Sequence, residues 1–328
     1  MATAEQVKAL IRSHAEGDDS RFYSIAVQVA AHAARAGHTK LAQDLRKMVD
    51  EAKARADAAP IAPRTKPVPV VQPRGELSGL LTVGYPKLRL VDMALHDGVR
   101  GRLDRVILEQ REQRRLREHG LTPLRKLLLV GAPGTGKTMT AGALAGELGL
   151  PLFTIQLHGL ITKFMGETAA KLRLVFDAIE STRGVYFFDE LDAFGIERGA
   201  RNDVGEIRRV LNSFLQFLEQ DESASLILAA TNYPEMLDRA LFRRFDDVIE
   251  YELPSAQVAE KVMRSRLALL DTERVDWATA VDAASGLSHA DVTRACEQAA
   301  KNTILAHGSS IETSDLVSAL NERRAVHR

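Results

Sequence analysis

The sequence predicts an α/β protein in which a parallel sheet is flanked by helices, with a helical bundle before it and a small all-helical domain after it. Three observations lead to this prediction. Short apolar runs alternate with helical patterns between residues 77 and 254. A glycine-rich phosphate-binding motif directly follows the first of the four runs. After residue 254 the pattern is helical only, so residues 255–328 should form the small domain.

Residues 1–57 have the pattern of three short amphipathic helices. Gly17 and Gly37 can end the first two, and Thr39 can cap the third. We expect this unit to bind a substrate or partner. Residues 58–76 then hold five prolines, which remove backbone donors and fix φ. An extended linker is therefore expected there, with an ordered arm packed on the next domain as the alternative.

Residues 77–254 should form the sheet domain. Four apolar runs have the length of buried strands, and the stretch 171–180 between them places its large apolar residues on one helical face. Buried strands that alternate with helices are typical of a parallel sheet covered on both sides. The predicted strands are residues 127–130, 152–155, 185–188 and 226–230.

The composition is that of an ordinary globular protein, with 45% hydrophobic and 27% charged residues among 328. Basic and acidic residues are equal at 44 each, which disfavours a protein that grips nucleic acid by its backbone. The single cysteine, Cys296, excludes an internal disulfide and fits a reducing compartment. Neither a secretory signal nor a membrane-spanning run is visible, so we expect a cytoplasmic protein.

Residues 131–138 read Gly-Ala-Pro-Gly-Thr-Gly-Lys-Thr and match the pattern G-x-x-x-x-G-K-[ST] between a strand and a helix. The glycines let backbone N–H groups surround phosphates, and the helix N-terminus adds a positive dipole end. Lys137 should reach the β- and γ-phosphates, while the Thr138 hydroxyl should hold Mg²⁺. This segment predicts binding of a nucleoside triphosphate. The candidate nucleotide-binding residues are Gly131, Pro133, Gly134, Thr135, Gly136, Lys137, Thr138 and Met139.

Two carboxylates follow the third predicted strand. Asp189 should bind Mg²⁺ together with Thr138, and Glu190 should polarise the water that attacks the γ-phosphate. An adjacent acidic pair at a strand end can also be a solvated turn. Because it follows the phosphate loop at the usual distance, we interpret it as the catalytic pair, and binding is thus joined to hydrolysis.

These motifs and those that follow them resemble the AAA ATPases over residues 77–320. By this resemblance Asn232, after the fourth strand, reads the γ-phosphate and the water. Arg243 and Arg244 resemble the arginine fingers, which reach the ATP site of a neighbouring subunit. The resemblance therefore implies a homo-oligomer, usually a hexameric ring. Here the two arginines are adjacent, whereas many relatives space them, so their individual roles stay open.

Residues 163–167 resemble the pore loop of protein-threading members of the family. Phe164 would project into the channel of the ring, beside Lys163, Met165 and Gly166. An aromatic ring and a thioether can grip many side chains without sequence preference. The alternative is that Phe164 packs in the core.

Residues 285–291 resemble the small-domain motif that contacts the nucleotide near its base. The family commonly has glycine where this chain has His289, for which we expect a capping or surface role. Arg294 is a weak candidate for a sensor arginine. The chain as a whole resembles short bacterial AAA ATPases often encoded beside a subtilisin-like serine protease. It has no H-E-x-x-H or G-x-S-x-G motif of its own, so a partner would do any proteolysis.

The sequence thus predicts an ATP-hydrolysing ring that unfolds, remodels or threads a protein substrate, and that can regulate or feed a partner serine protease. Two alternatives stay open. The first is a nucleotide-gated switch that controls a partner protein, and the second is an ATPase that remodels nucleic acid.

Overall fold

The computed structural model describes Lys47 and residues 75–160, 165–194, 204–237 and 239–326. The chain separates into two compact units, residues 1–67 and 68–328. The helical bundle predicted for residues 1–57 and nearly all of the predicted linker lie outside the described residues. Gly75 and Glu76, at the end of that predicted linker, belong to the short 3-10 helix Gly75–Gly79.

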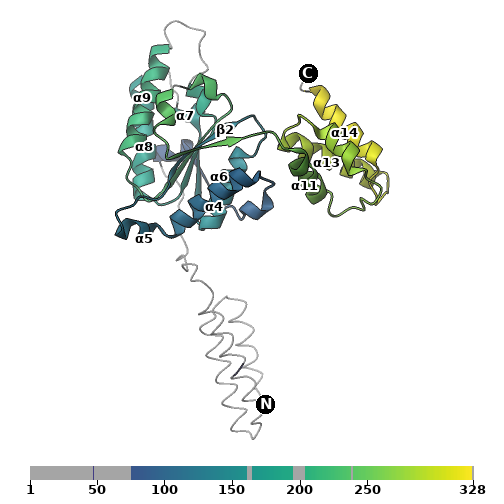
Figure 1. Ribbon diagram of the computed structural model, residues 1–328. Helices are drawn as coiled ribbons and strands as arrows, with labels where there is room; N and C mark the ends of the chain where they lie inside the picture. The colour runs from purple at the N-terminus through teal and green to yellow at the C-terminus, as the bar shows by residue number, and fades with distance from the viewer. Residues whose placement is uncertain (1–46, 48–74, 161–164, 195–203, 238, 327–328) are drawn as a thin grey trace, which may run out of the picture. The chain divides into compact units, whose positions relative to one another are not determined.

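The second unit contains a six-stranded sheet in the order β1-β3-β4-β5-β2-β6 (Figure 1). All neighbouring strands run parallel except β1, which pairs antiparallel with β3 at the edge. The strands are β1 Leu81–Gly84, β2 Lys126–Gly131, β3 Leu152–Ile155, β4 Val185–Phe188, β5 Leu226–Thr231 and β6 Asp247–Tyr251. The predicted α/β fold with a mostly parallel sheet is confirmed.

All four predicted strands are present: β3 and β4 have the predicted bounds, and β2 and β5 are longer by one or two residues. Sequence reasoning missed β1 and β6. Strand β1 is short and ends in glycine at the sheet edge, and β6 begins with a charged residue. Neither has the continuous apolar run that marks a strand buried on both faces, so periodicity gave no signal.

Helices cover both faces of the sheet. On one side α8 and α9 pack over it, and on the other α4 and α6 do (Figure 1). The α-helices of this part are α4 Asp97–Arg111, α5 Gln113–Glu118, α6 Lys137–Leu148, α7 Leu157–Leu160, α8 Met165–Ser181, α9 Val204–Gln220 and α10 Arg239–Phe242. Further 3-10 turns are Leu90–Asp92, Leu191–Phe194 and Pro234–Met236.

Alternate residues of the central strands enter two different cores. In β2, Leu128 and Val130 join the core under α8 and α9, whereas Leu127 and Leu129 join the core against α4 and α6. This follows from the period of two along a strand. Strand β4 is fully buried on both faces for the same reason. The continuous apolar runs in the sequence therefore correspond to strands between two helical layers.

After the sheet the chain forms four helices, α11 Ala256–Arg266, α12 Trp277–Ala284, α13 His289–Leu305 and α14 Thr313–Val326. The side chains of Ser255, Asp276 and Ser288 accept hydrogen bonds from backbone N–H groups at the starts of the first three. A separate apolar core joins the four helices. Its centre includes Cys296, which is buried, and burial raises the pKa of its thiol to about 12. The thiol is therefore protonated and unreactive at neutral pH.

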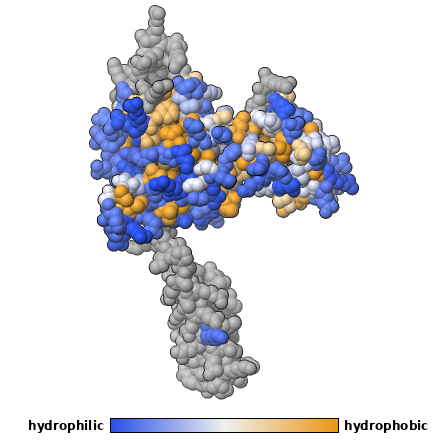
Figure 2. Space-filling model, viewed as in Figure 1, coloured by the Kyte–Doolittle hydropathy of each residue, from blue (hydrophilic) through white to orange (hydrophobic). Residues whose placement is uncertain are grey.

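The surface seen in Figure 2 is mainly hydrophilic, with smaller hydrophobic groups between the charged residues. Among the described residues, no helix combines the length and the apolar character needed to cross a membrane.

Candidate nucleotide site

The phosphate loop connects the carboxyl end of β2 to the N-terminus of α6. Its backbone needs glycine: Gly134 has φ +77° and Gly136 has φ +108°, both in the left-handed region. The Lys137 ammonium donates hydrogen bonds to the carbonyls of Gly131 (2.6 Å) and Ala132 (2.9 Å), so its charge lies inside the loop. Burial lowers the pKa of this ammonium, while Asp189 and Asp192 oppose the shift. The loop thus holds a cation and unsatisfied helix N–H groups where phosphates would bind.

Strand β4, which β5 separates from β2 in the sheet, ends at the same edge and brings the acidic pair to the phosphate loop. The Thr138 hydroxyl donates a hydrogen bond of 3.0 Å to the Asp189 carboxylate. A hydroxyl and a carboxylate are the hard oxygen ligands that Mg²⁺ prefers, and one or two protein ligands suffice when phosphates complete the shell. No cluster of three or more potential metal ligands occurs among the described residues. The pair therefore fits a metal held jointly by protein and nucleotide.

Glu190 has a strained backbone. Its φ of +53° lies in the left-handed region, which is unusual for a residue with a side chain. Such strain persists only where surrounding contacts impose it, and it is concentrated at functional sites. Here the Glu190 N–H bonds the Asp189 carboxylate at 3.0 Å. The side chain of Glu190 is exposed and lines the cavity described below.

Asp192 is a buried carboxylate that sequence reasoning missed. It accepts a hydrogen bond of 3.1 Å from the Asn232 backbone N–H and so ties the end of β5 to the turn after β4. The sequence does carry a signal for it. Asp192 is the third acidic residue within four positions of the end of β4, and the predicted metal-binding and water-polarising roles use only two. The hydrogen bond between Asp192 and Asn232 holds the Asn232 backbone at the end of β5 close to the turn that carries Glu190.

Two adjoining cavities, of about 520 and 430 Å³, lie at this edge of the sheet. Both are within the size range of small-molecule sites. The larger brings together nine of the predicted residues: Pro133, Gly134, Gly136, Lys137, Thr138, Met139, Asp189, Glu190 and Asn232. Thr135 lines the smaller cavity, and Gly131 lines neither, although its carbonyl accepts a bond from Lys137.

Arg294, the weak candidate for a sensor arginine, also lines the larger cavity, whereas the two finger arginines do not. Arg243 and Arg244 are exposed and line neither cavity. Lys163 and Phe164 lie outside the described residues. Met165 and Gly166 are the first two residues of α8, whereas the sequence pattern indicated a loop preceding the helix.

His289, Thr293 and Arg266 line both cavities and were not predicted as site residues. His289 is the first residue of α13, and its buried ring nitrogens make no hydrogen bond of good geometry with the described residues. Burial, with a contribution from His96, lowers the pKa of His289 and favours the neutral ring, while the nearby Ala94 backbone opposes the shift. A buried polar group without a partner is costly and marks a place for a ligand. The expected surface or capping role is therefore not what the geometry indicates. Instead, the side chain of Ser288 caps the helix.

The start of α13 also contacts the phosphate loop directly. The Ala290 N–H donates a hydrogen bond of 3.0 Å to the Gly134 carbonyl. A Cβ atom at Gly134 would lie 2.6 Å from the Ser288 hydroxyl, which is closer than real Cβ contacts come. Position 134 therefore requires glycine for two reasons. Its backbone is left-handed, and the start of α13 lies too close for a side chain.

A strand, a glycine-rich loop and a helix N-terminus, with an acidic residue at the end of β4, two strands away in the sheet, define a nucleotide-binding P-loop domain. The family model described as "ATPase family associated with various cellular activities (AAA)" matches residues 127–253. An uncharacterized AAA family ATPase, y4kL of Sinorhizobium fredii, is 32% identical over 98% of this chain and 96% of its own length. The chain belongs to the AAA family of ATPases, and its activity is ATP hydrolysis.

Other relatives are longer proteins. The ATP-dependent zinc metalloprotease FtsH 1 of Methylacidiphilum infernorum is 35% identical over 74% of this chain and 41% of its own length. FtsH of Lancefieldella parvula is 36% identical over 62% of this chain and 33% of its own. The chain therefore matches only a third to two fifths of the length of these two metalloproteases.

Proposed function

We propose that this chain is one subunit of an ATP-driven ring that unfolds, remodels or threads a protein substrate. Residues 77–254 would act as the large domain and residues 255–328 as the lid that closes over the nucleotide. The first 57 residues would recruit the substrate. The proposal assigns the ring six subunits, by resemblance to the family, and a reducing, cytoplasmic compartment, which the single buried thiol supports.

The residues around the larger cavity supply a division of labour for hydrolysis. Lys137 binds the phosphates, Thr138 and Asp189 hold Mg²⁺, and Glu190 accepts a proton from the attacking water while Asn232 orients it. Bound Mg²⁺ would neutralise charge on the β- and γ-phosphates. The hydrogen bond between Thr138 and Asp189 and the shared cavity support these roles.

One observation carries the ring in particular. Asp246, just after the two arginines, donates its backbone N–H to the Lys126 carbonyl at the beginning of β2. The phosphate loop begins at the other end of this six-residue strand, about 16 Å away at the usual rise per residue. Arg243 and Arg244 therefore lie too far from their own cavity to act in it. If the arginines of each subunit entered the cavity of its neighbour, every ATP site in the ring would be complete.

Any proteolysis coupled to this ring would be carried out by a partner, for which we propose a serine protease of the subtilisin type. Relatives named as metalloproteases match this chain over only part of their length, which supports a motor that works beside a protease activity.

The test is a substrate trap in the full-length chain. Glu190→Gln should bind ATP but hydrolyse it little, so a protein held in the channel should be released slowly. Capture from native lysate with ATP should retain a protein partner, and the added substitution Phe164→Ala should abolish that capture while ATP binding persists. Capture of nucleic acid, or capture that is equal with and without Phe164, would contradict threading.

A further inference from the structure

The two predicted finger arginines form a short turn between α10 and β6. Both side chains are exposed, and the next residue, Phe245, is buried in the core under α8 and α9. The Arg244 N–H donates a hydrogen bond of 3.0 Å to the Leu241 carbonyl, which closes the turn. The two guanidinium groups therefore start from neighbouring positions on a fixed backbone, and only their side-chain contacts can distinguish them.

Arg244 has a partner in its own subunit. Its guanidinium donates a hydrogen bond of 2.8 Å to the carboxylate of Glu219, near the end of α9. The two side chains are 42% and 56% exposed, so this ion pair contributes little free energy to folding. Its effect is to orient Arg244 along α9.

Arg243 has no hydrogen bond or ion pair with any of the described residues, although it too is exposed. A guanidinium carries five N–H donors that match phosphate oxygens in a planar fork. Arg243 therefore has its full set of donors available for a group outside the subunit, whereas Arg244 has already used part of its set.

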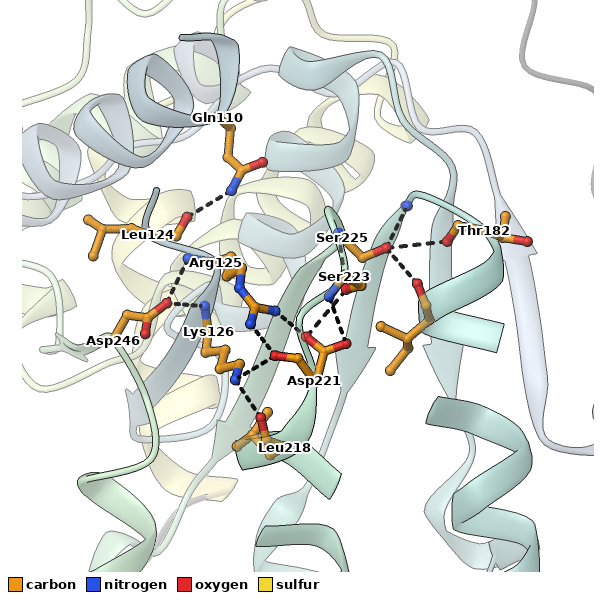
Figure 3. A network of polar contacts seen from close by, with 12 residues as sticks. Gln110, Leu124, Arg125, Lys126, Thr182, Leu218, Asp221, Ser223, Ser225 and Asp246 are labelled. Atoms are coloured by element: carbon orange, nitrogen blue, oxygen red, sulfur yellow. Dashed lines mark hydrogen bonds and ion pairs between the residues drawn. The ribbon is translucent and has the colours of Figure 1, made fainter. Parts of the chain in front are cut away.

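A buried polar network fixes the place where this turn meets the sheet (Figure 3). The Asp246 carboxylate accepts two hydrogen bonds of 2.8 Å, from the backbone N–H groups of Arg125 and Lys126. The Lys126 ammonium donates to the carbonyls of Leu218 and Asp221 (Figure 3). The same few residues thus join the arginine turn, the start of β2 and the end of α9.

Glu219 lies within this arrangement, because it follows Leu218 directly and precedes Asp221 by two positions. Asp221 is buried and also pairs with the Arg125 guanidinium (Figure 3). The partner of Arg244 is therefore held on a rigid support. A rigid support makes an exposed ion pair an effective positioning contact, because neither chain segment can move away from the other.

We propose that Arg243 alone reaches the phosphates in the neighbouring subunit, and that Arg244 is a positioning residue, tied to α9 through Glu219. This inference rests on the proposed ring. Arg243 would neutralise charge on the transferring phosphoryl group, a contribution of roughly 10³–10⁵ in rate for an arginine finger. Arg244 would set the direction of the turn that carries Arg243.

Separate substitutions test this division in the full-length ATPase. Arg243→Ala should lower kcat by about 10³ or more with little change in KM. Arg244→Ala should lower kcat about tenfold at most, and Glu219→Gln should have the same effect because both remove one positioning contact. The charge swap Glu219→Arg with Arg244→Glu should restore much of the lost rate.

Subunit mixing separates this inference from the ring on which it rests. Arg243→Ala subunits keep an intact cavity, and Lys137→Ala subunits keep an intact arginine turn, so the mixture should hydrolyse ATP faster than either variant alone. If Arg243→Ala is inactive and no mixture recovers, the ring proposal fails. If mixing rescues Arg244→Ala from an equally deep loss, while Arg243→Ala stays active, the ring stands and the division between the arginines is overturned.

Discussion

At the scale of single residues, the site combines a strained carboxylate, a buried cation and an unpartnered imidazole. Glu190 is held at φ +53°, and Lys137 bonds the loop carbonyls until a phosphate replaces them. His289 stands where both cavities meet, with its ring nitrogens buried and unsatisfied. All three residues line the larger cavity, so strain, burial and missing hydrogen bonds gather at one place.

The lowered pKa of His289 predicts a loss of stability in mild acid. Burial disfavours the charged ring, so folding stabilises the neutral form, and this contribution is complete above the ordinary histidine pKa of about 6.5. It should be lost as pH falls through the lower pKa of the folded state. His289→Phe, which cannot titrate, should therefore show a smaller drop in thermal midpoint between pH 7.5 and pH 5.5 (both values approximate).

His96 adds to the shift and the Ala94 backbone opposes it, and Arg266 lines the same two cavities as His289. A matched control is His119→Phe, because His119 is exposed in the turn after α5 and its ring contacts only the Arg115 carbonyl among the described residues. It should leave the acid sensitivity unchanged. Equal acid sensitivity in His289→Phe and the unsubstituted protein would contradict the prediction.

At the scale of elements, α6 determines how the phosphate loop is held. Residues 141–145 of this helix are all buried, and all but Leu144 are alanine or glycine. Gly146, the next residue, approaches the segment before α4 so closely that a Cβ atom there would lie 2.1 Å from the Leu88 carbonyl oxygen. The helix can thus pack against backbone, which fixes the position of its N-terminus relative to the sheet.

Gly146→Ala should therefore destabilise the fold, by about 1–3 kcal/mol, because the contact atom is backbone and cannot rotate away. Gly101→Ala is the control: Gly101 lies in α4, is exposed, and has no atom within 4 Å of the added Cβ. Alanine favours helix over glycine, so this variant should gain roughly 0.5–1 kcal/mol. Urea unfolding of both variants would measure the difference, and equal shifts would refute the packing argument.

At the scale of the whole molecule, the proposed ring would make a single subunit incomplete, because the cavity and the arginines are separated. The cavity lies at the carboxyl end of β2, and the arginine turn lies at its beginning. In the proposed ring, an arginine of one subunit in the ATP site of the next would couple hydrolysis between subunits.

Hydrolysis per subunit should accordingly rise with protein concentration and level off once rings are complete. An about hundredfold dilution series, with ATP in excess, would measure this by phosphate release. Arg243→Ala should stay low at every concentration, since assembly no longer completes its sites. A rate per subunit that is constant on dilution below the range in which sedimentation detects assembly would argue for a self-sufficient monomer.

The motifs that could be identified from the sequence are those whose residues are adjacent in the chain and serve one function. The phosphate loop, the pair Asp189 and Glu190, and the four continuous apolar strands are all local patterns, and local backbone and side-chain chemistry suffices to identify them. Family membership followed from the same segments. Strands β1 and β6 were missed because their positions depend on pairing with β3 and β2 rather than on their own composition.

Only the tertiary structure decided which distant residues share a site. His289 and Asp192 acquired their surroundings from segments that the chain folds against them, and no local pattern records such a meeting. The difference between Arg243 and Arg244 likewise depends on Glu219, which lies 25 positions from Arg244 in the sequence. Sequence by itself determined the chemistry available to this protein. The packing of helices and strands determined where that chemistry acts, because long-range contacts arise only when the chain is folded.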